Sequence, residues 1–162
     1  MRIYEIKARN LNHVAYPVGL LITSESRSGS SIGILYPKEH EILVDYIEKP
    51  VRLISTKMKE ILCACEKMID VKPAFLHHPK EDISWDYWTF RVQSQFVLHE
   101  KTKYDSFGRI EKPILDRSMV KHYNIFSVIG LLEERVFISL PILEALVRYD
   151  ITGFHAEEIE LN

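Results

Sequence analysis

The apolar residues of this chain come in short runs, and most of the runs predict β-strands. The first third holds four such runs, at 3–6, 18–22, 32–35 and 42–46. Runs of this length, bounded by polar and turn-forming residues, are typical of strands. A serine-rich polar stretch at 24–31 predicts an exposed connecting loop. Residues 1–50 are therefore expected to be rich in strands.

After Pro50 the spacing changes and predicts a helix. Ser55 stands where a serine side chain caps a first helical turn. The apolar positions that follow are three or four residues apart: Met58, Ile61, Leu62, Cys65 and Met68. This spacing puts them on one face, which packs against a core. After Asp70 the chain turns extended again, and Pro73 argues against a central strand there.

Apolar and polar positions alternate between Trp85 and Leu98. One parity carries Trp88, Phe90, Val92, Phe96 and Leu98, and the other carries Tyr87, Thr89, Arg91, Gln93 and Gln95. A period of two predicts an antiparallel sheet with one face on the core and the other facing water or a partner. Turn-forming residues from Tyr104 to Gly108 then predict a hairpin-like excursion between Leu98 and Leu115.

The last third predicts strands at 125–129, 136–138 and 154–161. In the final strand the apolar positions change parity, which predicts a bulge near Glu157 and Glu158.

A second helix is expected between these strands, from Leu140 to about Tyr149, with Ser139 as its cap and Pro141 in its first turn. Because it has few polar positions, this helix is expected to be mostly buried.

Two segments share a strand-cap-helix pattern. Ile54-Ser55-x-x-Met58-x-Glu60-x-Leu62 recurs 84 positions later as Ile138-Ser139-x-x-Ile142-x-Glu144-x-Leu146. A duplication would produce this pattern, and so would convergence on good helix capping. The sequence as a whole predicts one α+β domain over residues 1–162, mostly antiparallel sheet with two main helices.

Composition narrows the function classes. With 46% apolar residues, 27% charged residues and a net charge of -2, the chain has the balance of a folded globule and lacks the basic field that nucleic acid binding needs. Its apolar runs are far shorter than the ~20 residues of a membrane span, and its charged N-terminus is unlike a signal peptide. A cytoplasmic protein is expected, with neither nucleic acid nor membrane as partner.

No motif in the sequence predicts catalysis, a metal site or a cofactor. Cys63 and Cys65 are two positions apart on a predicted helix and point in different directions, so a buried or half-buried free thiol is expected at each. The best local cluster of candidate groups is His77, His78, Glu81 and Asp82, expected in a solvated surface loop. If these four converged in one cleft, they would instead indicate a small hydrolase or transferase.

Acidic and aromatic residues are interleaved in one segment and acids dominate another. Glu81, Asp82, Trp85 and Asp86 form the first group, and Glu157 and Glu158 belong to the acidic C-terminal strand. Such surfaces suit an interface with a basic protein. The alternative for Trp85 is that it packs in the core.

Three stretches resemble a family of bacterial immunity proteins from polymorphic toxin systems, immunity protein family eleven. They are 51–62 (Val-Arg-Leu-Ile-Ser through Met-Lys-Glu-Ile-Leu), 97–121 (Val-Leu-His-Glu-Lys through Ser-Met-Val-Lys), and 124–161, whose Asn-Ile-Phe-Ser-Val-Ile-Gly and Val-Phe-Ile-Ser-Leu-Pro-Ile-Leu are the strongest match. The resemblance covers 51–162. The sequence departs from the family at His99, where an aspartate is usual.

This resemblance implies a protein that binds and neutralises a cognate toxin effector by occluding it, without catalytic residues of its own. A homodimer formed through an exposed strand edge is a further alternative, and it would have a symmetric interface.

Overall fold

The computed structural model describes residues 1–9, 17–22, 31–35, 42–67, 69–78, 80–110 and 112–162, and the predicted loop at 24–31 lies outside them except for Ser31. One sheet has five strands in the order β12-β1-β11-β10-β8. These are β12 Phe154–Glu158, β1 Ile3–Ala8, β11 Val136–Ser139, β10 Ile125–Val128 and β8 Ser94–Gln95. Neighbours are antiparallel except β10 and β8.

A second sheet has six strands in the order β2-β3-β6-β7-β5-β4. These are β2 Pro17–Ile22, β3 Ser31–Leu35, β6 Ile69–His78, β7 Ile83–Val92, β5 Leu53–Ser55 and β4 Tyr46–Ile47. Only β3 and β6 run parallel. A parallel pair of short strands, β9 Ile114–Leu115 and β13 Glu160–Leu161, completes the sheet structure.

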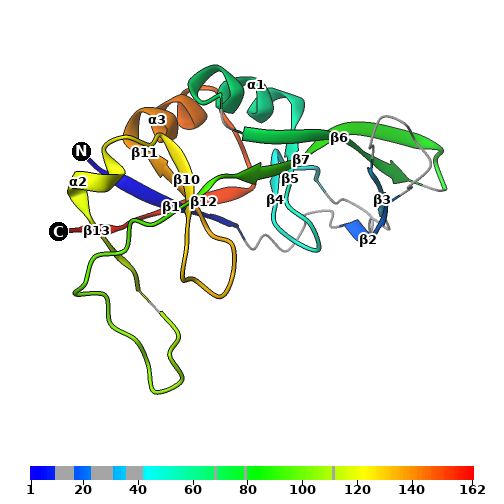
Figure 1. The fold of residues 1–162 in the computed structure, drawn as a ribbon. Coiled ribbons are helices and arrows are strands. Elements are labelled where there is room, and N and C mark those ends of the chain that lie inside the picture. The colour runs from blue at the N-terminus through cyan, green and yellow to red at the C-terminus, as the bar shows by residue number, and fades with distance from the viewer. Residues whose placement is uncertain (10–16, 23–30, 36–41, 68, 79, 111) are drawn as a thin grey trace.

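Two helices, α1 Thr56–Cys65 and α3 Leu140–Arg148, lie side by side on one side of the molecule, and a short helix, α2 Arg117–Val120, lies near the C-terminus (Figure 1). None of the described helices is long and apolar enough to cross a membrane. The α+β fold with mainly antiparallel sheets, expected from the sequence, is confirmed.

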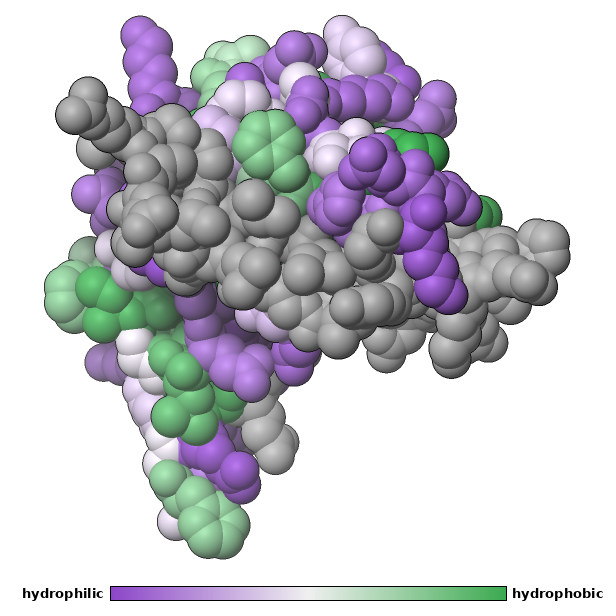
Figure 2. Space-filling view, turned by 90° about the vertical axis from the view of Figure 1, so that its right-hand side faces the viewer, coloured by the Kyte–Doolittle hydropathy of each residue, from purple (hydrophilic) through white to green (hydrophobic). Residues whose placement is uncertain are grey.

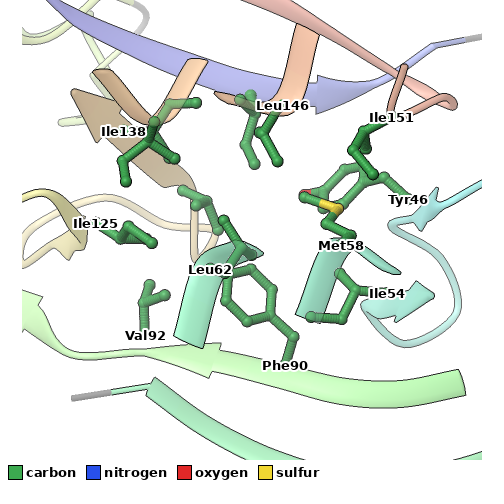
Figure 3. Close-up of a cluster of buried hydrophobic side chains, with 13 residues drawn as sticks. Tyr46, Ile54, Met58, Leu62, Phe90, Val92, Ile125, Ile138, Leu146 and Ile151 are labelled. Carbon is green, nitrogen blue, oxygen red and sulfur yellow. The ribbon is translucent and has the colours of Figure 1, made fainter. Parts of the chain in front are cut away.

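The main core joins both sheets to both helices (Figure 3). Its buried members are Ile6, Tyr46, Ile54, Met58, Leu62, Phe90, Val92, Ile125, Val136, Ile138, Ile142, Leu146 and Ile151. Two further clusters cover the opposite faces of the sheets: one around Leu53 and Tyr87, the other around Phe126 and Phe137. β10 and β11 are therefore buried on both faces, which is why their sequences are continuous apolar runs.

The strand-cap-helix pattern is part of a larger repeat. The orders β6-β7-β5-β4 and β12-β1-β11-β10 correspond strand for strand, all antiparallel, and a helix follows β5 in one set and β11 in the other. The parallel pair of β3 with β6 corresponds to that of β9 with β13. The structure therefore shows the same arrangement twice along the chain.

The register repeats as well. Trp88 lies opposite Ile54, and Tyr4 lies opposite Ile138. Trp88 follows Tyr4 by 84 positions and Ile138 follows Ile54 by 84 positions, which is the interval of the strand-cap-helix pattern. β1 opens the first half of the chain but lies in the sheet of the second half, and β7 opens the second half but lies in the sheet of the first. The two halves exchange their first strands.

Helix α1 begins as predicted. The hydroxyl oxygen of Ser55 accepts the backbone N–H of Met58 at 3.2 Å, and Met58 and Leu62 are buried on the inner face. Met68 lies outside the described residues. The helix ends at Cys65, which is exposed, whereas Cys63 is half-buried. The expectation of burial is therefore wrong for Cys65, which lies in the last turn of α1, beyond its buried residues Met58 and Leu62.

Helix α3 is less buried than predicted. Ile142 and Leu146 are its buried residues, and Val147 is 62% exposed. Pro141 lies in the first turn, but the Ser139 side chain makes no capping hydrogen bond. Its hydroxyl instead donates to the side-chain oxygen of Asn124 at 3.4 Å. One face of α3 is left open because no described element covers it.

Two strand predictions in the six-stranded sheet are wrong. The regular strand expected at 42–46 is only the short β4, from Tyr46 to Ile47. Pro73 lies inside β6, a central strand. Pairing with β3 starts at Ala74, so no described strand lies beside Pro73 on that side, and its missing N–H leaves no gap in that ladder.

The alternation in β7 does not separate a dry face from a wet one. Tyr87, on the polar parity, is buried because the second core cluster covers that part of the sheet. Phe96, on the apolar parity, is 76% exposed because β7 ends at Val92. The bulge predicted near Glu157 and Glu158 is wrong, because β12 pairs with β1 in regular register through Glu158. The strand is interrupted at Ile159 instead, between β12 and β13.

Candidate functional site

A cavity with a volume of about 810 Å³ lies on the sheet face away from α3. Its floor comes from β1 and β12. Its walls come from the β4–β5 turn and from two loops, the excursion at 99–113 and the β10–β11 loop at 129–135. In Figure 1 both loops project on the side opposite α1 and α3.

A buried ion pair forms the floor. Glu5 on β1 is 2% exposed, and both oxygens of its carboxylate accept hydrogen bonds from Arg135, one from Nε and one from Nη2. Lys7 Nζ approaches the same carboxylate at 3.5 Å. A buried carboxylate is stable only when it is paired and hydrogen-bonded, so Arg135 fixes the floor in this geometry.

The charged network continues across the sheet to β12. Lys7 Nζ donates to the Glu157 carboxylate at 2.5 Å, and His155 Nε2 lies 3.4 Å from its other oxygen. The hydrogen bond from Lys7 holds the pKa of Glu157 below its ordinary value. Glu157 was predicted to contribute negative charge to an interface with a basic protein. Lys7 largely compensates this charge within the chain.

The excursion is tied together at its base. Its ends are bridged by the antiparallel pair Leu98 and Leu115, as predicted. The Thr102 hydroxyl donates to the carbonyl of Ile114 at 2.9 Å and accepts its N–H at 3.2 Å. These contacts close the loop across its neck.

The tip of the excursion is organised around Asp105. One oxygen of its carboxylate accepts the backbone N–H groups of Phe107 and Arg109, each at 2.8 Å, and the other accepts Arg109 Nε at 3.0 Å. The backbone N–H of Arg109 is the main reason that the pKa of Asp105 lies below its ordinary value. Gly108 has a φ of 73°, which its lack of a side chain permits. The tip therefore has a defined shape.

Each loop presents an apolar side chain to solvent. Phe107 in the excursion and Leu132 in the β10–β11 loop are both 79% exposed, the highest values among the described large apolar residues. Tyr104 is 58% exposed in the same excursion. Figure 2 shows apolar side chains gathered on the projecting lower part of the molecule. Apolar groups on ordered loops around a charged cavity are typical of interaction sites.

The partner-binding residues predicted from the sequence lie in two separate places. Glu81 and Asp82 form the turn between β6 and β7, and Asp86 is exposed nearby on β7. Trp85 is partly buried and packs against the second core cluster, which agrees with the alternative that it packs in the core. Glu157 and Glu158 lie on β12, in the other sheet. Of these six residues, only Glu157 takes part in the network beside the large cavity.

The cluster considered for a hydrolase or transferase is only partly a solvated loop, because Glu81 and Asp82 are exposed in the turn but the two histidines are not part of it. His77 and His78 end the strand β6, and His78 is buried and accepts the backbone N–H of Glu81 at 3.1 Å. His77 lies 3.1 Å from the hydroxyl of Ser84. The described cavities have none of His77, His78, Glu81 or Asp82 in their walls. These histidines close the hairpin turn.

Sequence reasoning missed the central residues of this site. Glu5 and Arg135 are 130 positions apart, and nothing in the alternation of β1 marks Glu5 as buried. The one available signal was a glutamate between the apolar residues Ile3 and Ile6 of a predicted strand.

Within the described ranges, no group of three or more His, Cys, Asp or Glu side chains is placed to hold a metal ion. Comparison of the chain with protein-family models and with curated proteins finds no match.

Proposed function

We propose that this protein binds another protein through the face formed by its two projecting loops. The observation that carries the proposal is the exposure of Phe107 and Leu132 on the two loops that wall the cavity floored by Glu5 and Arg135. Exposed apolar side chains beside a charged depression combine the apolar anchors and the polar surroundings of a protein interface.

Preorganisation supports binding at this face. The bonds of Asp105 and Thr102 fix the excursion before any partner arrives. A loop that is already ordered loses little conformational entropy on association, so more of the contact energy becomes affinity. A loop that only connects two strands through solvent does not require an ordered tip.

The partner that we propose is a cognate bacterial toxin effector in the cytoplasm, neutralised by occlusion. The support for this choice is the resemblance of 51–162 to immunity protein family eleven. Both loops and Arg135 lie within that stretch. The loop face would then cover a functional surface of the toxin.

Coexpression with the toxic domain encoded by a neighbouring gene tests this proposal. The unaltered protein is expected to rescue growth and to purify with the toxin as one complex. Phe107→Asp combined with Leu132→Asp should weaken the complex by about tenfold or more, because a charge replaces each apolar anchor.

Ile83→Asp is the matched control. Ile83 is 44% exposed at the β6–β7 turn, beside the other group of predicted residues. It should leave rescue unchanged. Loss of rescue with Ile83→Asp alone would move the interface to that turn, and growth arrest with no complex would refute the pairing with that toxin.

A further inference from the structure

β12 is the edge strand of the five-stranded sheet, and its outer side has no strand beside it among the described residues. The Arg9 N–H donates to Gly153 O and the Ile159 N–H donates to Ile3 O, both at 2.9 Å. Because N–H and C=O groups alternate in direction along a strand, the odd-numbered residues of β12 face β1.

The even-numbered residues of β12 therefore direct their backbone groups outwards. These are Phe154, Ala156 and Glu158, and no described backbone or side-chain group pairs with their N–H or C=O. A row of unpaired groups on an edge strand is a template for another strand.

Next to this edge lies a cavity of about 430 Å³ between α3 and β12. Its apolar wall includes Leu143 and Val147 of α3 and Phe154 and Ala156 of β12. An added strand would place alternate side chains in this space, below the exposed face of α3. Val147, which is exposed in the single chain, would be covered by such a strand.

The polar side chains of β12 indicate which strand fits. If two β12 strands pair antiparallel about Ala156, His155 of each copy lies opposite Glu157 of the other. Centring the pair on Glu157 would instead place two glutamates opposite each other, and centring it on His155 would place two histidines opposite each other. A histidine opposite a glutamate can donate a hydrogen bond to its carboxylate, whereas two glutamates opposite each other repel, so the sequence of β12 is complementary to itself in one register.

We infer that β12 pairs antiparallel with β12 of a second copy of this chain, centred on Ala156. The small side chain of Ala156 lets the two α3 helices approach across the two-fold axis. The two five-stranded sheets become one continuous sheet. Both loop faces then point to the same side, so the dimer would present two partner-binding faces together.

Sedimentation equilibrium of the full-length protein, without any partner, tests this inference. A concentration-dependent dimer is expected. Ala156→Pro should abolish it, because proline removes the outward N–H of Ala156 without removing a donor to β1. A monomer at every concentration would overturn the inference.

Two substitutions of His155 distinguish a loss of strand pairing from a loss of folding. His155→Glu places glutamates opposite Glu157 and should raise the dimer dissociation constant by about tenfold. His155→Lys places a hydrogen-bond donor opposite Glu157 in that register and should leave the dimer intact. Thermal unfolding of both variants checks that each is folded. A dimer that is insensitive to both Ala156→Pro and His155→Glu would show that another surface associates.

Discussion

Asp45 and Thr152 join the two halves of the chain. One oxygen of the Asp45 carboxylate accepts the backbone N–H of Thr152 at 2.8 Å and its hydroxyl at 2.9 Å, although the residues are 107 positions apart. The other oxygen accepts the hydroxyl of Ser55 at 2.6 Å. Asp45 therefore links the turn after α3 to the residue that caps α1.

Asp45→Ala should destabilise the protein by about 2 kcal/mol, because hydrogen bonds to a charged group contribute about 1.5–3 kcal/mol. Ser55 and Thr152 would lose their acceptor together. Urea unfolding measures the change, and Asp86→Ala, at an exposed position on β7, is the control expected to change stability little. Equal effects of the two substitutions would contradict the role of Asp45.

The two helix caps should respond differently to the same change. Ser55→Ala removes the acceptor for the N–H of Met58 and should cost about 1 kcal/mol or more. Ser139→Ala should cost less, because Ser139 makes no capping hydrogen bond and only a long one to Asn124. Unfolding curves of the two variants, measured side by side, test this order.

The buried pair in the cavity floor should be costly to break from one side. Arg135→Met leaves the Glu5 carboxylate buried with only Lys7 nearby, and about 3 kcal/mol of stability should be lost. The double variant Glu5→Leu with Arg135→Met should recover much of this loss, because no unpaired charge remains. A double variant with the summed cost of the two single changes would show that the pair is not coupled.

Two buried tyrosines provide a matched comparison. The Tyr87 hydroxyl donates to the carbonyl of Val44 at 2.7 Å, whereas the Tyr46 hydroxyl has no hydrogen-bond partner within the described structure. Tyr87→Phe should cost about 1 kcal/mol, and Tyr46→Phe should cost nothing or stabilise. Thermal unfolding of both variants, compared with the unaltered protein, decides the order.

Burial also predicts how stability depends on alkaline pH. It raises the pKa of Tyr46 to about 12 from an ordinary value of 10.0. Above pH 10 this tyrosine ionises in the unfolded chain while it stays neutral in the folded one, so the full stability is present below pH 10 and decreases as the pH rises towards 12. Unfolding measured across this range should show a smaller loss for Tyr46→Phe.

The sequence predicts local structure where one local signal acts alone. Ser55 followed by Met58 and Leu62 predicts the start and inner face of α1 because capping and helical spacing involve near neighbours. The prediction that Pro73 does not lie in a central strand is wrong, because a proline is excluded only where a partner strand accepts a hydrogen bond from that residue's N–H. The pairing that decides this comes from β3, about forty positions away.

The candidate site was harder to predict for the same reason. Phe107 and Leu132 are ordinary apolar residues in the sequence, and their exposure depends on where Asp105 and the ends of each loop hold the backbone. Glu5 becomes a buried charge only because Arg135 meets it across the sheet. Long-range pairing, which the alternation of single strands does not encode, determines both features.

The exchange of first strands sets an order of events during synthesis. β1 is translated well before its neighbours β11 and β12, with Lys7 and Glu157 150 positions apart. Until then Ile3 and Ile6 have no sheet to join and are available to chaperones. The nascent chain must keep β1 soluble until β11 and β12 have been translated.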